Sequence, residues 1–305
     1  MNQSNPDHGT PKRASEPLFE SMTFVGVGLI GGSLARAARE HGLVSRIIGL
    51  GRGQENLRRA RELGVIDVME TDWEKGLRDA EIVVLATPVE SIVQLLPRVA
   101  SLCKDETIVT DVGSVKGSIV QEAERTLSTP GRFVGGHPIA GTENSGAEAS
   151  FATLFVDRKT ILTPTERTDP EALEKVRRLW EAVGSTVILM DTDHHDRVMG
   201  FVSHLPHIVA YALVHTVYSE DQREGNLARF SAGGFLDFTR IASSHPEMWR
   251  DICLMNRDAL LEALESYALT LDKLKELILA KDGKGLEEHF AQCRKTRADL
   301  LKTAK

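Results

Sequence analysis

A run of glycines near the start of the chain constrains the fold more than any other feature. Gly26, Gly28 and Gly31 lie where an apolar stretch, Thr23–Val27, gives way to a helical pattern, Leu34–His41. In a strand–turn–helix unit the first glycine permits the tight turn, the second lets the backbone approach a pyrophosphate, and the third lets the helix pack on the strand. The helix N-terminus attracts the phosphate charge. The motif therefore predicts a dinucleotide site, rather than a glycine-rich turn without a ligand, at Gly26, Gly28, Leu29, Ile30 and Gly31.

Short β-rich runs alternate with helical stretches from Met22 to about Leu189. The predicted strands are Thr23–Val27, Arg46–Gly49, Ile82–Ala86, Thr107–Thr110, Arg132–Val134, Thr160–Leu162 and Thr186–Leu189. The predicted helices are Leu34–His41, Gln54–Leu63, Val89–Ser101, Lys116–Thr126 and Pro170–Val183. This alternation predicts an α/β fold of the Rossmann type, with a parallel sheet that helices cover on both faces. Asp169 and Pro170 suit the N-cap and the first position of the last helix.

After Asp191 the strand signals stop and the pattern becomes helical. Residues Arg197–Ser219 are apolar nearly all round, Asp251–Leu279 carry apolar residues at helical spacing, and Gly285–Thr303 form a charged amphipathic helix. The apolar surplus predicts helices that pack between two subunits. We therefore expect a disordered leader over 1–21, an NAD(P)-binding domain over 22–190, and an all-α substrate-binding and dimerisation domain over 191–305.

Composition excludes several classes of protein. The net charge of −7 argues against a nucleic-acid partner. Cys103, Cys253 and Cys293 show neither a disulfide framework nor metal-ligand spacing, which fits a reducing compartment. No apolar run approaches the ~20 residues that span a bilayer, and the first 20 residues lack the apolar core of a secretion signal. We expect a cytoplasmic homodimer that binds neither a membrane nor a metal.

The end of the second predicted strand bears on the choice of cofactor. An NAD site usually has an acidic residue there, which bonds the ribose 2′-hydroxyl. Here the strand is followed by Gly51 and Arg52. A glycine does not repel a 2′-phosphate and an arginine can bind one, so NADP is favoured over NAD. The alternative is an exposed arginine at a helix start. Thr87, Pro88 and Asp111, at the ends of later strands, are further candidates for the cofactor site.

His137 is the candidate catalytic base. It stands in Gly-Gly-His-Pro at the end of a predicted strand, where dinucleotide folds place their chemistry. Histidine is the side chain whose ordinary pKa allows proton transfer near neutrality. We expect the Ser114 hydroxyl to hold the ring in one tautomer, and Thr142 and Glu143 to line the pocket mouth. The alternative is a histidine with a purely structural role.

The helical part carries a second set of candidates. Ser203, His204 and His207 surround Pro206, which should kink or loosen its helix. Two histidines suggest a metal pair, but no third ligand has suitable spacing, so we expect no metal. Arg240 is the candidate to clamp a substrate carboxylate in a bidentate fork. The alternative for Arg240 is an ion pair with Asp237 or Glu247.

With these residues assembled, the chain resembles the prephenate/arogenate dehydrogenase family from about Met22 to the C-terminus. The motifs that carry the resemblance cover residues 26–34, 111–116, 137–143, 203–207 and 238–242. The resemblance implies oxidative decarboxylation of prephenate to 4-hydroxyphenylpyruvate in tyrosine biosynthesis. It also implies that His137 accepts the proton of the ring hydroxyl, that Ser114 orients it, and that Arg240 and His207 bind the substrate.

Three alternatives stay open at this point. Arogenate differs from prephenate only in an amino group in place of the keto group, so an arogenate or cyclohexadienyl dehydrogenase fits the same motifs. A β-hydroxyacid dehydrogenase shares the fingerprint and a helical second domain, but it fits the segment around His137 less well. A non-enzymatic NAD(P)-sensing protein would leave His137, His207 and Arg240 without a shared task. Tyrosine, which resembles the product, is a possible feedback ligand.

Overall fold

The computed structural model describes residues 16–142 and 144–303, which form two compact units. Unit 1 contains the chain up to Met199 together with Ser243–Met255, and unit 2 contains Gly200–Ala242 and the residues from Asn256 onward. Residues 1–15 of the predicted leader lie outside the described residues. The first strand begins at Phe19, whose side chain is buried, so the end of the predicted leader belongs to the sheet.

Unit 1 is built on one eight-stranded sheet with the order β3-β2-β1-β4-β5-β6-β7-β8. The strands are β1 (Phe19–Val25), β2 (Val44–Leu50), β3 (Val68–Glu70), β4 (Ile82–Leu85), β5 (Ile108–Asp111), β6 (Phe133–Pro138), β7 (Lys159–Thr163) and β8 (Thr186–Leu189). The first six strands have the Rossmann order, which confirms the predicted fold class.

One junction in the sheet differs from the predicted parallel arrangement. β6 and β7 are antiparallel, with His137 opposite Ile161, whereas every other neighbouring pair is parallel. A parallel pair needs a crossover connection, usually a helix. The segment between β6 and β7 has only the short 3₁₀ turn η2 (Ala147–Ala149) in its described part, so β7 returns beside β6 in the opposite direction.

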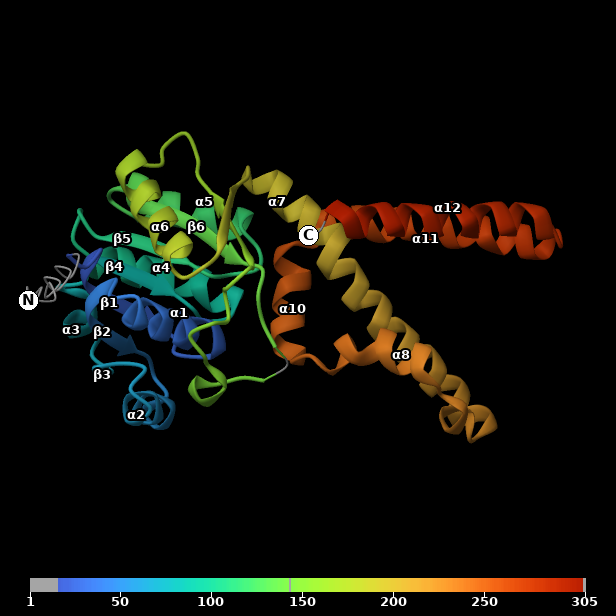
Figure 1. Cartoon of the computed structure of the whole chain (residues 1–305), viewed down its shortest axis with the longest axis horizontal. Coiled ribbons are helices and arrows are strands. Elements are labelled where there is room, and N and C mark those ends of the chain that lie inside the picture. The colour runs from blue at the N-terminus through green and yellow to red at the C-terminus, as the bar shows by residue number, and fades with distance from the viewer. Residues whose placement is uncertain (1–15, 143, 304–305) are drawn as a thin grey trace, which may run out of the picture. The chain divides into compact units, whose positions relative to one another are not determined.

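Helices pack around this sheet (Figure 1). They are α1 (Leu29–Glu40), α2 (Gln54–Glu62), α3 (Trp73–Leu77), α4 (Val89–Leu102), α5 (Gly117–Thr126) and α6 (Pro170–Ala182), with the 3₁₀ turn η1 (Pro130–Arg132). Two further helices of unit 1 contact this layer: α7 (Thr192–Met199) lies against α5, and α10 (Pro246–Met255) lies against α4. Sequence patterns did not predict the short elements β3 and α3. The predicted start of α6 is confirmed, because the Asp169 carboxylate accepts the backbone N–H of Glu171 at 2.8 Å and Pro170 is the first helical residue.

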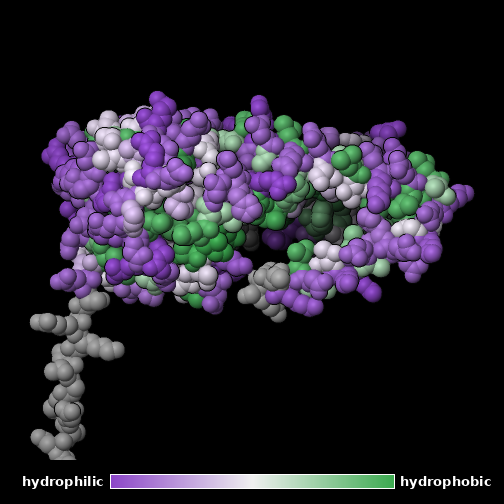
Figure 2. Space-filling model, turned by 90° about the horizontal axis from the view of Figure 1, so that it is seen from above, coloured by the Kyte–Doolittle hydropathy of each residue, from purple (hydrophilic) through white to green (hydrophobic). Residues whose placement is uncertain are grey.

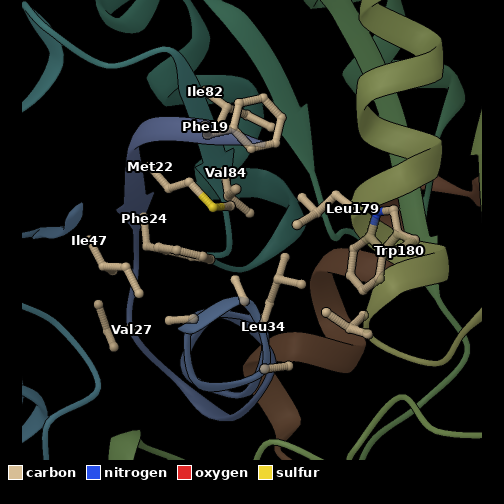
Figure 3. Packing of buried hydrophobic residues seen from close by; sticks show 14 of the residues in the cluster. Phe19, Met22, Phe24, Val27, Leu34, Ile47, Ile82, Val84, Leu179 and Trp180 are labelled. Atoms are coloured by element: carbon tan, nitrogen blue, oxygen red, sulfur yellow. The ribbon is translucent and has the colours of Figure 1, made fainter. Parts of the chain in front are cut away.

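The core of unit 1 lies between the sheet and its helices. Figure 3 shows side chains from β1, α1 and α6 in one cluster that includes Phe24, Leu34 and Trp180. These three side chains are fully buried. The central strands are apolar on both faces because both faces are covered. This packing fixes α1 against β1 and thereby fixes the glycine turn between them.

Unit 2 is helical. It contains a π-helical turn η3 (Gly200–His204), α8 (Leu205–Glu224), η4 (Leu227–Phe230), α9 (Gly233–Thr239), the start of η5 (Arg240–Ser243), α11 (Arg257–Leu279) and α12 (Gly283–Thr303). The π turn ends two residues before Pro206, which lacks the N–H that would bond the carbonyl of Val202. This confirms the predicted loosening of the helix at Pro206.

By length and composition, the helical stretch Thr192–Glu224 resembles a membrane span, and 22% of its most apolar 18-residue window is buried within the chain. Core helices of soluble proteins have the same length and composition. Apolar patches also reach the surface in the space-filling view (Figure 2). The large exposed side chains of unit 2 include Val202, Phe230, Leu269 and Leu279.

Candidate active site

The three fingerprint glycines occupy positions that suit their predicted roles. Gly26 has φ +93°, and a Cβ there would lie 2.8 Å from the carbonyl oxygen of Ala86. A Cβ at Gly31 would lie 2.6 Å from the Gly26 carbonyl oxygen, so helix and turn are in close contact. A Cβ at Gly28 would meet no protein atom within 4 Å and would extend into open space. Gly28 is the N-cap of α1 and gives it no side-chain cap, which leaves the turn suited to a phosphate group.

The remaining nucleotide-site candidates lie around this turn. Leu29 and Ile30 form the first turn of α1, and Thr87 contacts the position of a Gly26 Cβ through its methyl group. Pro88 is the N-cap residue of α4. Arg52 is exposed between β2 and α2, where its guanidinium can reach a ligand.

Asp111, at the end of β5, makes several buried contacts within unit 1. Its carboxylate is fully buried, accepts the backbone N–H groups of Gly113 at 2.8 Å and Gly136 at 3.1 Å, and pairs with the ammonium of Lys116. Lys116 is also buried and donates to the Gly136 carbonyl at 2.8 Å. Burial lowers the pKa of Lys116, and the neighbouring Asp111 only partly opposes this shift. Through these internal contacts Asp111 joins β5 to β6, and its place at the cofactor site stays a prediction.

His137 is the penultimate residue of β6 and is half-buried. Its Nδ1 lies 2.8 Å from Nε2 of His195, and the two rings meet edge to face at an interplanar angle of 66°. We expected Ser114 to hold the ring. Among the described residues, His195 is the hydrogen-bond partner at Nδ1, and Ser114 follows Gly113 on the loop after β5.

His195 is in turn held by Asp196. Nδ1 of His195 lies 2.8 Å from Oδ1 of Asp196, and the ring is fully buried in α7. The Asp196 carboxylate also accepts the backbone N–H groups of Lys116 and Gly117, each at 2.8 Å, at the start of α5. Burial lowers the pKa of His195. Burial alone would raise the pKa of Asp196, but the hydrogen bonds from His195 and the two backbone groups lower it overall.

Sequence reasoning did not single out His195 and Asp196. His195 is 58 residues from its partner His137, so no local spacing links the two. The signal present in the sequence is the polar run Asp193–Asp196 directly before an apolar helix. This run holds two histidines and two aspartates, and any of these side chains that the fold buries needs a hydrogen-bond partner.

The loop after His137 is fastened to the nucleotide-binding helices. Asn56 of α2 donates to the carbonyl of Val27 at 2.9 Å, and its Oδ1 accepts the N–H of Ala147 at 3.3 Å. Asn56 therefore connects the glycine fingerprint to the segment that follows His137. Thr142, in that segment, is exposed and accepts the N–H of Asn144 at 3.3 Å. Glu143 lies outside the described residues.

In unit 2, the predicted substrate residues cluster around the π turn. The Ser203 carbonyl accepts Nδ1–H of His207 at 2.9 Å, so neutral His207 presents Nε2 as an acceptor. Nδ1 of buried His204 lies 3.0 Å from the amide nitrogen of Asn256. Burial lowers the pKa of His207, and the charge of Arg240 lowers it further. Arg240 forms no ion pair with Asp237 among the described residues of this unit.

Comparison with protein families identifies two matching models. Residues 34–189 match the model described as prephenate dehydrogenase, nucleotide-binding domain, and residues 191–292 match prephenate dehydrogenase, dimerization domain. The chain is 38% identical to a prephenate dehydrogenase of Bacillus subtilis, over 93% of this chain and 76% of the relative. It is also 38% identical to a cyclohexadienyl dehydrogenase of Zymomonas mobilis, over 93% of this chain and 97% of the relative.

Solved structures show the same similarity. The prephenate dehydrogenase of Aquifex aeolicus in complex with hydroxyphenyl propionate and NAD+ superimposes with a TM-score of 0.88 at 40% identity, covering 95% of this chain and all (100%) of that one. The arogenate dehydrogenase of Synechocystis superimposes with a TM-score of 0.79 at 34% identity, covering 92% of this chain and 99% of that one.

Proposed function

The chain belongs to the prephenate dehydrogenase family of NAD-dependent oxidoreductases, and we propose that it converts prephenate to 4-hydroxyphenylpyruvate and carbon dioxide while NAD+ or NADP+ is reduced. The observation that carries this proposal is the placement of His137. It ends a strand of the nucleotide-binding sheet, and its ring is held at Nδ1 by a buried neighbour. That placement supports a base beside a nicotinamide.

The chemistry needs a proton acceptor at the ring hydroxyl. A nicotinamide held at the glycine turn of α1 would supply the hydride acceptor for the carbinol carbon. His137 accepts the hydroxyl proton, which eases the departure of that hydride, because a neutral imidazole suits this task near pH 7. The bond to the ring carboxylate then breaks, carbon dioxide leaves, and the proton on His137 returns to the phenolate oxygen. Atoms and charge balance without any further reactant.

We assign substrate binding to unit 2 and the loops of unit 1. Prephenate is a dianion, so Arg240 clamps one of its carboxylates through two N–H groups. His207 accepts a hydrogen bond from a substrate hydroxyl at Nε2 when it is neutral, and it donates from Nε2 to a second carboxylate when it is protonated. Ser203 and His204 in unit 2, and Thr142 and Glu143 in unit 1, stay predicted substrate residues, and Ser114 stays a predicted residue that orients His137. The guanidinium of Arg240 and the imidazole and hydroxyl donors among these residues supply the local complement to a dianion that the net charge of −7 would otherwise repel.

We propose NADP+ as a substrate alongside NAD+. The exposed Arg52 and the absence of a carboxylate at Leu50–Arg52 support binding of a 2′-phosphate. The test is the KM for each cofactor in the enzyme and in Arg52→Gln. The variant should raise the KM for NADP+ more than the KM for NAD+. A strong preference of the unaltered enzyme for NAD+ would contradict this assignment.

A steady-state matrix of two substrates against two cofactors tests the proposed function. We expect reduction of cofactor with prephenate, and we keep arogenate as the second candidate because relatives named for both activities match the chain. If neither substrate supports reduction, the dehydrogenase assignment is wrong and a nucleotide-sensing role takes its place. Adding tyrosine to the same assay tests feedback inhibition, because tyrosine shares the ring and carboxylate of the product.

We propose that the enzyme works as a cytoplasmic homodimer. The match to a dimerization domain and the exposed apolar side chains of unit 2 support a second copy as the partner that covers them. The same covering accounts for the long apolar stretch Thr192–Glu224 without a membrane.

A further inference from the structure

We propose that His195 and Asp196 form a positioning pair that fixes the proton of His137 on Nδ1 and thereby makes Nε2 the base of the reaction. The inference rests on the proposed function for the reaction itself. The position of the proton, however, can be measured without any substrate.

The direction of each hydrogen bond follows from the acceptor at the far end. An ionised carboxylate can only accept. The Asp196 carboxylate accepts two backbone N–H groups at 2.8 Å each, and a third donor at 2.8 Å must be Nδ1–H of His195. Neutral His195 then has its lone pair on Nε2. The contact of 2.8 Å between the rings therefore requires His137 to donate from Nδ1, which leaves the lone pair of His137 on Nε2.

The surroundings keep His195 neutral and Asp196 ionised. His195 is fully buried, so its charged form is penalised, and the nearby ammonium of Lys116 opposes a further positive charge. Asp196 and Asp111 act in the opposite direction, but burial prevails and the pKa of His195 is lowered. The backbone N–H groups at the start of α5 favour the charged form of Asp196. Both assignments of charge thus agree with the hydrogen-bond directions.

The same group of residues stabilises His137 after it accepts a proton. Beside the ion pair of buried Asp111 and buried Lys116, the ionised carboxylate of Asp196 places a negative charge on the far side of His195. An imidazolium at His137 keeps its Nδ1–H on His195 and gains from that charge through a medium that screens weakly. A positioning pair of this kind sets the tautomer and also favours the protonated state that the reaction forms.

The decisive variant is His195→Phe in the full-length enzyme, because it keeps a buried ring and removes both hydrogen bonds. We expect kcat with prephenate to fall about 10- to 100-fold, with the KM values for substrate and cofactor changed less than about 3-fold. His195→Gln retains one donor and one acceptor, and it should recover kcat to within about 5-fold of the unaltered enzyme. His194→Phe is the matched control, since it makes the same change at the exposed neighbouring residue and should leave kcat unaltered.

A spectroscopic readout separates positioning from general damage to the fold. Long-range ¹H–¹⁵N spectra of the labelled enzyme without substrate, assigned with His137→Asn, report which ring nitrogen of His137 carries the proton. We expect the Nδ1–H form in the unaltered enzyme and in His195→Gln, and a shift toward Nε2–H in His195→Phe. An Nε2–H form in the unaltered enzyme would overturn the proposal, as would an unchanged kcat in His195→Phe. If prephenate is not a substrate, the spectra still decide the tautomer, so the two failures are distinguishable.

Discussion

Unit 1 buries most of its large apolar side chains, whereas unit 2 leaves most of its own exposed. Trp180, Phe24 and Leu34 are fully buried in unit 1, but the buried apolar residues among the described part of unit 2 are Ala210, Leu260 and Ala263. Phe230 in unit 2 is 85% exposed and Leu269 is 72% exposed. Unit 1 therefore has its own apolar core, while the exposed apolar side chains on the helices of unit 2 favour a partner surface.

The two units also differ in the chemistry that we assign to them. Unit 1 contains the glycine fingerprint and the proposed base His137, and unit 2 contains Arg240 and His207, to which we assign the substrate. Changes in unit 1 should therefore affect kcat, cofactor binding or intrinsic stability. Changes in unit 2 should affect substrate affinity or assembly.

The largest effect is expected at His137. His137→Asn removes the proton acceptor and should lower kcat by about 10²–10⁴-fold, with smaller changes in the KM for prephenate. Steady-state kinetics with a fixed, saturating cofactor measure both values. A variant with near-normal kcat would remove His137 from the mechanism and with it the assignment of chemistry to unit 1.

A change at Arg240 should separate binding from chemistry. Arg240→Gln loses charge-assisted hydrogen bonds to a carboxylate, which are worth about 1.5–3 kcal/mol, so the KM for prephenate should rise about 10- to 150-fold. The fall in kcat should be smaller. If the KM is unchanged, Arg240 does not clamp the substrate, and the division of tasks between the units fails.

The exposed apolar surface of unit 2 can be tested through assembly. Phe230→Asp places a charge where we expect a second copy, so the dissociation constant of the dimer should rise about 30-fold or more. Sedimentation equilibrium measures it. Leu189→Asp changes an exposed apolar residue of unit 1 and should leave the constant unaltered. Equal effects of the two changes would mean that unit 2 is not the interface.

Substitution of two glycines in unit 1 should affect two different properties, stability at Gly31 and cofactor binding at Gly28. Gly31→Ala forces a Cβ to within 2.6 Å of a backbone oxygen, and it should lower the free energy of unfolding by about 1–3 kcal/mol. Gly28→Ala meets no protein atom within 4 Å, so stability should stay constant while the KM for the cofactor rises about tenfold. Urea titration and cofactor kinetics on both variants provide the comparison. A stable Gly31→Ala would show that the turn can relax.

The smallest effect concerns acid stability. Burial lowers the pKa of His195, so below the unfolded pKa of about 6.5 the unfolded chain binds a proton that the folded chain does not. Stability should therefore fall as pH decreases from 7.5 to 5.5, and the loss should be smaller in His195→Gln. The groups facing His195 are His137, Asp196, Lys116 and Asp111, and urea midpoints at both pH values measure the difference. An identical loss in the variant would mean that His195 is protonated in the fold.

Local sequence patterns predicted the elements that local chemistry determines. The fingerprint turn, the cap at Asp169 and the loosened helix before Pro206 each depend on residues within a few positions of one another. The antiparallel direction of β7 was not predicted, because the residues of a strand do not show its direction. The segment that connects it to the preceding strand determines that direction. The buried pairing of Asp111 with Lys116 was also not predicted, because the sequence pattern does not show which lysine packs beside a strand-end carboxylate.

The bridge made by Asn56 limits how the cofactor preference of this enzyme can be redesigned. Exchange of the segment after β2 is the obvious route from one nicotinamide cofactor to the other, since Gly51 and Arg52 lie there. A transplant that extends through α2 would replace the amide that bonds both Val27 and Ala147. The new sequence would then alter the loop after His137 as well as the ribose pocket. A graft that ends at Gly53 keeps the two properties independent.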